Sequence, residues 1–525
     1  MPWGSQSEYR IFCVVDMAPK LPSRLVETVI IDGGALTPEQ VAAVALGNAK
    51  ASLSDDLGDR LEPARRVVDR VVGSDEVVYG ITTGFGALAT TNIGKDETEA
   101  LQYNLLRSHA TGVGDPLPDE VVRAMLLLRA RTLSQGHSGV RPLIVEKLLE
   151  LLDRGILPVV PSQGSVGASG DLAPFAHLAL PLIGEGEVKI AGETRDSSAT
   201  AFESVRLLTK EGLSLLNGTE GMTAMGSLAL HHGRHLVAAA DAAAALSVEA
   251  LLGSARPFRS EIHALRPHPG QIGSAERIAR LIEGSSIIAS HSDDFEHAVQ
   301  DAYSLRCAPQ VHGAVADTLD HMHRVISIEM GSVVDNPIVF ADSGEVLSGG
   351  NFHGEPLAFV NDFAAIALSE LASISERRTD RMLDPARSQG LPPFLAAKPG
   401  VESGYMITQY VQAALVAENK VLAHPASVDS VPTSGGQEDH VSMGWGAGRK
   451  LLTIVDNVRR VLAIEILCGV EAVEHRAPLT PGDGTRAIVS AVRARVPRLE
   501  GDRPHSAHIE TVASMIESGE ITALT

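Results

Sequence analysis

The sequence Gly-Ser-Val-Gly-Ala-Ser-Gly-Asp-Leu-Ala-Pro occupies residues 164–174 and contains the triplet Ala168, Ser169 and Gly170. If the backbone nitrogen of Gly170 attacks the carbonyl carbon of Ala168 and two waters leave, one of them the Ser169 hydroxyl, a five-membered ring with an exocyclic methylene forms. Ring closure needs a compressed backbone that Cβ atoms resist, and the glycines of this stretch relieve that resistance. The loop can therefore generate an electrophile that no standard side chain provides.

Other Ser-Gly motifs fit this stretch less well. A nucleophile elbow would need glycine where Asp171 stands, and a phosphate-binding P-loop would need a Gly-Lys-Ser/Thr ending. The bare tripeptide is most often an ordinary loop, but the longer string closely resembles the cofactor loop of the aromatic amino acid ammonia-lyases and aminomutases. Their ring is 4-methylideneimidazole-5-one (MIO). The resemblance implies that MIO forms from the chain itself and that no external cofactor is needed.

The composition is that of an acidic globular protein. The chain has 525 residues, of which 44% are hydrophobic and 4% aromatic, and its formal net charge is −21. This charge argues against a nucleic-acid or anionic-membrane partner. The three cysteines, Cys13, Cys307 and Cys468, are odd in number and far apart, which disfavours a disulfide framework and favours a reducing cytoplasm.

The N-terminal segment lacks the features of an export signal. Its apolar run at 11–15 is too short for a signal peptide and is flanked by Glu8 and Asp16, and no stretch approaches a membrane span. We therefore expect a cytoplasmic protein. Because the recognisable pattern begins only near Leu36, we also expect Met17 to be the true start.

Helical patterns dominate the chain, above all after residue 220. A helix is expected from Leu36, with Thr37 as N-cap and Pro38 at the first helical position, and a short strand is expected at 77–79. Apolar residues recur at helical spacing in several longer stretches. These predict helices over 119–131, 143–154, 236–252, 357–382 and 450–473. The last three are long and apolar enough to form the core of a bundle.

The family resemblance implies a specific architecture for these helices. It is a mainly α-helical fold, a long-helix bundle similar to the fumarase and aspartase superfamily, with a smaller mixed N-terminal region that carries the MIO loop. The expected divisions are an N-terminal extension at 1–35, the mixed region at 36–225, and the bundle with the C-terminal region at 226–525. The resemblance also implies a homotetramer whose active sites are shared between subunits.

Eliminating ammonia from an amino acid requires a base, because the β-proton is barely acidic. The segment Tyr-Gly-Ile-Thr-Thr-Gly-Phe-Gly at 79–86 resembles the family segment that carries the catalytic tyrosine, although Thr82 stands where many members have Asn or Ser. The resemblance therefore implies that Tyr79 is the base. A free phenol has a pKa of about 10, so this role requires a positive potential nearby.

A second long match supplies candidates for binding the substrate carboxylate. The string Val-Gln-Asp-Ala-Tyr-Ser-Leu-Arg-Cys-Ala-Pro-Gln at 299–310 resembles the family segment whose tyrosine and arginine face the substrate. Arg306 offers a planar fork suited to a carboxylate. Tyr303 and Gln300 can form hydrogen bonds around it.

Two further segments resemble parts of the family site. Leu-Leu-Asn-Gly-Thr at 215–219 implies that Asn217 lies near the carboxylate and the ring oxygen. Ser-Gly-Gly-Asn-Phe-His-Gly-Glu-Pro at 348–356 implies that Phe352 walls the site. Either segment can also be a helix-capping turn, and an Asn-Gly pair is typical of one.

Substrate choice within the family depends on two places. Ser108-His109 resembles the histidine-acting members, in which this histidine contacts the substrate ring, although tyrosine-acting relatives can also keep it. The string Gln-Glu-Asp-His-Val-Ser-Met at 437–443 differs from the Asn-Gln-Asp of the phenylalanine- and tyrosine-acting members. Glu438 can accept a hydrogen bond from an imidazole N–H or assist proton transfer, whereas a neutral aromatic ring would leave it unpaired. Gly436 replaces the family's Asn before Gln437.

The resemblance thus predicts a carbon–nitrogen lyase that converts L-histidine to trans-urocanate and ammonia, the first step of histidine degradation. The predicted catalytic residues are Ala168, Ser169, Gly170, Tyr79 and Glu438. The predicted substrate-binding residues are His109, Asn217, Gln300, Tyr303, Arg306, Phe352 and Gln437. A tyrosine or phenylalanine lyase, or an aminomutase, is the nearest alternative. A non-catalytic helical assembly is the alternative from another class.

No metal site is predicted from the sequence. His231 and His235 have the spacing of two ligands on a helix, but the glutamate of the H-E-x-x-H motif is missing. His321 and His323 are similarly unconvincing. One face of an amphipathic helix explains both groups.

Overall fold

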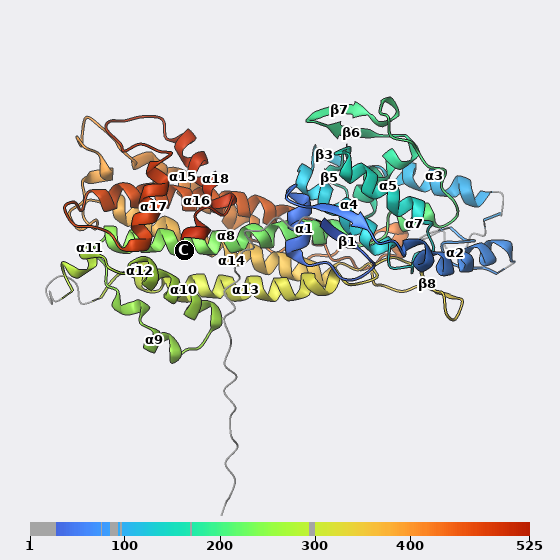
Figure 1. Cartoon of the computed structure of the whole chain (residues 1–525), viewed down its shortest axis with the longest axis horizontal. Coiled ribbons are helices and arrows are strands. Elements are labelled where there is room, and N and C mark those ends of the chain that lie inside the picture. Colours follow the sequence, from blue (N-terminus) through green and yellow to red (C-terminus); the bar gives the residue numbers. More distant parts are fainter. Residues whose placement is uncertain (1–27, 75, 85–92, 95–96, 168–170, 293–299) are drawn as a thin grey trace, which may run out of the picture.

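The computed structural model describes residues 28–74, 76–84, 93–94, 97–167, 171–292 and 300–525. A long helical bundle forms one part of the molecule, and a smaller region of helices and short strands forms the other (Figure 1). The mainly α-helical fold predicted from the sequence is confirmed. Met17 lies outside the described residues, so its role as the start remains a prediction.

The smaller region combines seven described helices with nine short strands. Its helices are α1 (Pro38–Ala45), α2 (Leu57–Gly73), α3 (Thr98–His109), α4 (Asp119–Leu133), α5 (Pro142–Asp153), α6 (Leu172–Ala179) and α7 (Glu211–Ser214). Its strands are β1 (Thr28–Ile31), β2 (Lys50–Leu53), β3 (Val113–Pro116), β4 (Leu157–Pro158), β5 (Pro161–Gln163), β6 (Glu187–Ile190), β7 (Glu193–Asp196), β8 (Ile338–Phe340) and β9 (Glu345–Leu347). β1 pairs in parallel with β2, whereas β3–β5, β4–β6–β7 and β8–β9 are antiparallel.

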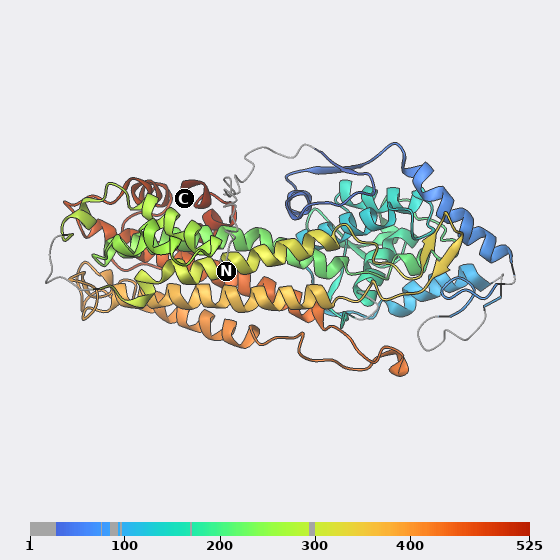
Figure 2. The same ribbon diagram turned by 90° about the horizontal axis from the view of Figure 1, so that it is seen from below.

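The bundle is built on four long helices that run side by side (Figure 2). They are α8 (Glu220–Ala250), α13 (Ala308–Glu329), α14 (Glu355–Leu383) and α16 (Gly444–Glu474). Shorter helices cover them: α9 (Ser260–Ala264), α10 (Pro269–Leu281), α11 (Ser286–Ala289), α12 (Tyr303–Arg306), α15 (Met406–Leu422), α17 (Asp483–Arg493) and α18 (Ser506–Glu517). Alanines fill the centre of α8 and are buried, so neighbouring helices can approach it closely.

Two bundle helices begin earlier than the sequence pattern predicts. α8 starts at Glu220 rather than Leu236, and α16 starts at Gly444 rather than Lys450. Glycine has a low intrinsic helix propensity, so propensity alone does not predict a helix in these first turns. Here the glycines allow close packing, because a Cβ on Gly221 would lie 2.5 Å from Trp445 and one on Gly444 would lie 2.6 Å from Met222.

The predicted helix start near Leu36 is confirmed, and the predicted strand at 77–79 is wrong. Thr37 caps α1, and its side chain accepts a hydrogen bond from the Gln40 N–H. Tyr79 instead lies in a turn, where the backbone N–H of Val78 bonds to the Thr82 hydroxyl at 2.9 Å. This local hydrogen bonding competes with strand pairing.

The prediction that no stretch approaches a membrane span needs a correction at one bundle helix. α14 is long and apolar enough to cross a membrane by length and composition alone. However, 61% of its most apolar stretch is buried, and α14 packs against α8, α13, α15 and α16. These contacts are those of the core helix of a bundle.

Candidate active site

The loop that carries the Ala-Ser-Gly triplet lies where several helices begin. α6 starts directly after the loop, and α14 and α16 start against its first half. The Val166 carbonyl accepts a hydrogen bond from the Met443 N–H at 2.8 Å, and the Gly167 carbonyl accepts one from the Ser442 hydroxyl at 3.2 Å. Helix N-termini carry partial positive charge, so the loop lies in a region that favours anions. Ala168, Ser169 and Gly170 themselves lie outside the described residues.

Asp171 anchors the far side of the loop. Its N–H donates to the Gly218 carbonyl at 2.9 Å, and its carboxylate accepts from the Met222 N–H and the Ser165 hydroxyl, each at 3.1 Å. The side chain is fully buried, and this burial raises the pKa of Asp171 to about 7. These contacts fix the loop to the first turn of α8.

Gly167 leaves no room for a side chain on the near side of the loop. Its φ is +72°, and a Cβ there would lie 2.2 Å from the Ser442 hydroxyl oxygen and 3.0 Å from the Gly444 nitrogen. The backbone is thus held in a conformation that suits glycine and is clamped from both ends. The residues on both sides of the triplet are therefore held in place by hydrogen bonds and close packing.

His109 and Glu438 come together from distant parts of the chain. His109 ends α3, just before β3, and Val113 of β3 pairs with Gln163 at the start of the loop. Burial lowers the pKa of His109, and the Glu438 carboxylate acts in the opposite direction. The two predicted substrate-ring contacts therefore share one site.

The hydrogen bonds of His109 and Glu438 determine what each can offer a ligand. Nδ1 of His109 lies 2.9 Å from the Leu105 carbonyl oxygen and 3.1 Å from the Ser108 hydroxyl oxygen. Because the carbonyl can only accept, we assign the proton to Nδ1, which makes Nε2 of the neutral ring an acceptor. Glu438 is half-buried, and one of its oxygens accepts from the Thr433 hydroxyl at 2.6 Å. Gln437 is exposed on the adjoining turn.

Asn217 and Tyr79 both border the segment that precedes β8. The Asn217 side chain is buried and donates to the Asn336 carbonyl at 3.0 Å. Tyr79 is half-buried, and the neighbouring Gly80 packs so closely that a Cβ would lie 3.0 Å from Pro337. Asn217 therefore lies just before α8, next to the Gly218 carbonyl that binds Asp171, and Tyr79 is adjacent to a residue that packs on the same segment before β8.

Phe352 lies on another side of this site. It is half-buried and precedes Gly354 by two residues. A Cβ added to Gly354 would lie 3.2 Å from the hydroxyl oxygen of Ser442, the residue that holds the loop. The start of α14 therefore places Phe352 near the loop.

The predicted carboxylate clamp is not part of this group of residues in one chain. Tyr303 and Arg306 lie on α12, which packs at the far end of the bundle from the strands of the smaller region (Figure 1). The Ser304 carbonyl of α12 accepts a hydrogen bond from Arg378, near the C-terminal end of α14. With a rise of about 1.5 Å per residue, Arg378 is roughly 35 Å from Glu355 at the start of α14.

The residues of the predicted carboxylate clamp retain polar groups that can bind a ligand. The Arg306 guanidinium lies over the Tyr303 ring, 4.6 Å from its centroid. The Arg306 Nε is buried and has no hydrogen-bond partner among the described residues. Tyr303 and Gln300 are exposed. A ligand or a second chain can therefore reach this surface.

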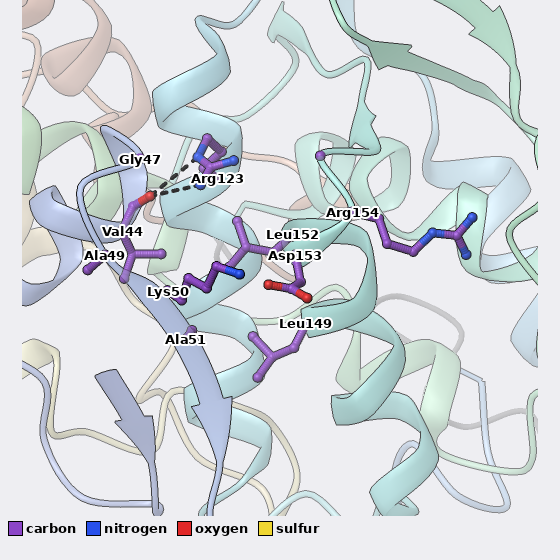
Figure 3. Close-up of a pocket in the computed structure, with 11 residues that line it drawn as sticks. Val44, Gly47, Ala49, Lys50, Ala51, Arg123, Leu149, Leu152, Asp153 and Arg154 are labelled. Carbon is purple, nitrogen blue, oxygen red and sulfur yellow. Dashed lines mark hydrogen bonds between the residues drawn. The ribbon is translucent and has the colours of Figure 1, made fainter. Parts of the chain in front are cut away.

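A surface cavity of about 310 Å³ lies elsewhere, between α1, β2, α4 and α5 (Figure 3). Arg123 at its edge donates to the Val44 carbonyl, and Lys50, Asp153 and Arg154 also line it. None of the predicted site residues lines this cavity.

One cluster near the loop is not among the residues predicted from the sequence. His353, Glu355 and His440 have side-chain donor atoms within 4.8 Å of one another. They come from two segments far apart in the sequence, so no short-range spacing could reveal them. The only local signal was a histidine within two residues of each of two predicted site residues, Phe352 and Glu438.

Comparison with known proteins agrees with this arrangement. The sequence model described as aromatic amino acid lyase matches residues 36–494. A histidine ammonia-lyase from Gloeobacter violaceus is 51% identical over 501 residues, which cover 95% of this chain and 97% of that protein. The crystal structure of a histidine ammonia-lyase from Trypanosoma cruzi has a TM-score of 0.87 at 40% identity and covers 95% of this chain and 94% of that one.

A tyrosine aminomutase from Streptomyces globisporus is similarly close in structure. Its TM-score is 0.90 at 38% identity, with coverage of 95% of this chain and 98% of that one. The long match to the family model and the identities over nearly complete chains lead to one conclusion. The chain belongs to the aromatic amino acid lyase family.

Proposed function

We propose that the chain is a histidine ammonia-lyase that eliminates ammonia from L-histidine to give trans-urocanate. The observation that carries this proposal is the meeting of His109 and Glu438 beside the Ala-Ser-Gly loop. The relatives named as histidine ammonia-lyases, which match nearly the whole chain at about half identity, support it.

His109 and Glu438 together suit an imidazole ring. A neutral imidazole has one N–H donor and one nitrogen acceptor. Nε2 of His109 and the Glu438 carboxylate are both acceptors, so either can receive the substrate N–H. A phenyl ring offers no N–H donor, so it cannot form the hydrogen bond that an imidazole ring can form with either acceptor.

We further propose that residues 168–170 form MIO. When formed, this group supplies an electrophilic methylene that activates the substrate amine as a leaving group. The clamped loop and the requirement for glycine at position 167 support the proposal. The helix N-termini around the loop would stabilise negative charge that develops there.

Tyr79 is the proposed base. It takes the β-proton at its phenolic oxygen, which requires the phenolate form. The positive ends of the helices that begin at the loop would favour negative charge that develops in the site. The buried amide of Asn217 would orient the substrate carboxylate.

The position of Arg306 supports a shared site built from several copies of the chain. One chain holds the loop at one end of its bundle and the carboxylate clamp at the other, roughly 35 Å apart along α14. A second copy in antiparallel contact would bring its clamp to the first copy's loop. We propose the homotetramer that the family resemblance implies.

Exposed apolar residues mark a surface on which such copies can meet. Phe359, Phe363 and Ile366 on α14 are 43%, 45% and 48% exposed, and they follow one helix face. Ile407, Tyr410 and Val411 on the adjoining α15 are also exposed. Apolar surface of this extent is typical of a protein interface.

The test is to incubate purified protein with L-histidine and to follow the absorbance of urocanate. The proposal predicts urocanate and ammonia in equal amounts from the wild type, and intact-mass measurement should find a chain lighter by two waters. Ser169→Ala should keep its full mass and lose the activity. An active Ser169→Ala, or a wild type that forms no urocanate, would overturn the proposal.

A tyrosine aminomutase is the second candidate, because such an enzyme has a similar fold over 95% of this chain. An aminomutase returns the ammonia to the β-carbon, so its product is a β-amino acid. Product analysis with L-tyrosine separates the two functions.

A further inference from the structure

We propose that His353, Glu355 and His440 form a binding site for a borderline divalent transition metal, with Zn²⁺ as the probe. One donor atom from each side chain lies within 4.8 Å of the other two. Among the described residues, this is the one group of three histidine, cysteine or carboxylate side chains whose donor atoms lie that close together.

The geometry of the cluster favours a common ligand. The two imidazole rings are stacked, with centroids 5.8 Å apart and planes only 6° from parallel. Nε2 of His353 lies 3.3 Å from the His440 carbonyl oxygen. This single hydrogen bond orients one ring, but it does not account for a glutamate carboxylate close to both rings.

The donor set selects a class of metal. Two imidazoles with one carboxylate are the protein ligands of many zinc sites, which keep a fourth position for water. Mg²⁺ and Ca²⁺ prefer oxygen ligands, so they should bind here weakly. Ligand bonds of about 2.0–2.2 Å set strict limits on the donor positions, so the three side chains must be able to move into place. The exposed side chain of His440 and the half-buried side chains of His353 and Glu355 leave freedom for this movement.

A bound metal would connect two segments of the proposed active site. His353 and Glu355 belong to the start of α14, directly after Phe352, whereas His440 follows Glu438 in the segment that leads into α16. The two segments meet through the Ser442 and Gly354 contacts at the loop. The metal would therefore cross-link the walls that carry Phe352 and Glu438. The binding proposal itself does not depend on which reaction the site performs.

The histidine cluster on α8 differs from this group in its contacts. His231 contacts both His232 and His235 edge to face on α8, but Nδ1 of His235 is bonded to the Thr522 hydroxyl at 2.9 Å. Burial lowers the pKa of each of these three rings, which is typical of histidines packed in a core.

The test uses full-length, tag-free protein stripped of metal with a chelator. Calorimetric titration with ZnCl₂ should give one saturable site per chain, and Co²⁺ should give a visible absorption band that Zn²⁺ removes. Removing a partner that only supports a metal ligand typically weakens binding about 10–100-fold, so losing a ligand itself should cost at least about tenfold. We expect this loss for His440→Ala, His353→Ala and Glu355→Gln.

His268→Ala is the matched control, because His268 is also exposed but lies at the start of α10. It should leave the Zn²⁺ affinity unchanged. Circular dichroism and the apo-protein Tm establish that each variant is folded. The proposal is overturned if Zn²⁺ shows no saturable binding, if binding persists in both His440→Ala and His353→Ala, or if His268→Ala weakens it equally. Urocanate formation by the stripped enzyme tests the proposed function separately.

Discussion

The Glu438 carboxylate lies within electrostatic reach of the His109 imidazole and opposes the lowering of its pKa by burial. The two residues come from opposite parts of the sequence, one at the end of α3 and the other in the segment before α16. This proximity is the basis of the proposed recognition of an imidazole ring beside the Ala-Ser-Gly loop.

Glu438→Gln should weaken binding of imidazole ligands selectively. A hydrogen bond to a charged group contributes about 1.5–3 kcal/mol, which corresponds to roughly 10- to 150-fold in affinity. The competitive inhibition constant of trans-urocanate should rise within this range, whereas that of trans-cinnamate should not rise. Equal weakening of both ligands would contradict imidazole recognition by Glu438.

Gly167→Ala should prevent ring formation. The added Cβ would lie 2.2 Å from the Ser442 hydroxyl oxygen, so the loop would have to move. We expect intact-mass spectra without the loss of two waters and activity reduced at least about 100-fold, which matches a change of about 3 kcal/mol or more in the barrier. Gly155→Ala is the control, because Gly155 also has a positive φ, +63°, but open space around its Cβ position. It should keep both the ring and the activity.

Two inactive variants should restore activity when they assemble together. Ser169→Ala removes the electrophile and Arg306→Ala removes the carboxylate clamp, and these residues belong to groups at opposite ends of the bundle. In a mixed assembly, some sites would combine an intact loop with an intact clamp from another copy. Co-expression with two different tags, followed by tandem purification, should recover part of the wild-type activity. A mixed assembly that stays inactive would refute the shared site.

The histidines of α8 should make the protein sensitive to acid. Burial lowers the pKa of His232 to about 3 and of His235 to about 4, whereas the unfolded chain protonates near 6.5. The unfolded state therefore binds more protons below pH 6.5, and the free energy of unfolding falls as the pH decreases towards 4. For His235 the loss between pH 7.5 and pH 5 is about 2 kcal/mol.

Urea unfolding at these two pH values, at constant protein concentration, measures this loss. His235→Gln should reduce the difference in unfolding free energy between them. The exposed His268→Gln should not, and an unchanged difference in His235→Gln would contradict the assignment.

The fully buried ion pair between Arg378 and Glu465 should be costly to break on one side only. Arg378 donates to both Glu465 oxygens, at 2.5 and 2.9 Å, and both side chains are fully buried. Arg378→Met would leave a buried, unpaired carboxylate and destabilise the bundle by about 3–5 kcal/mol. The double variant Arg378→Met/Glu465→Met should recover much of this free energy. Unfolding curves in which the double variant is no more stable than the single one would contradict this account.

Local sequence signals predicted the helices well where caps and periodicity agreed. α5 and α14 differ from the helices predicted over 143–154 and 357–382 by only one or two residues at each end. The early starts of α8 and α16 were not predictable, because their glycines favour helix only in contact with another helix. The turn at Tyr79 was missed because the hydroxyl of Thr82 replaces a strand partner.

In the candidate site too, local motifs indicate some residues, whereas the positions of others depend on how distant segments pack. Family motifs predict Tyr79, His109, Asn217, Phe352 and Glu438 as site residues, and the fold places the starts of α8, α14 and α16, which adjoin several of them, against the loop. The separation of Arg306 from this group depends on where α12 packs on α14, which no local pattern encodes. The cluster of His353, Glu355 and His440 likewise exists only because two distant segments meet.

The most direct measurement offers L-histidine, L-tyrosine and L-phenylalanine to the purified protein at equal concentrations and identifies every product by mass. The account predicts trans-urocanate and ammonia as the dominant products, with kcat/KM highest for L-histidine. Preferential formation of coumarate or cinnamate, or of any β-amino acid, would contradict it.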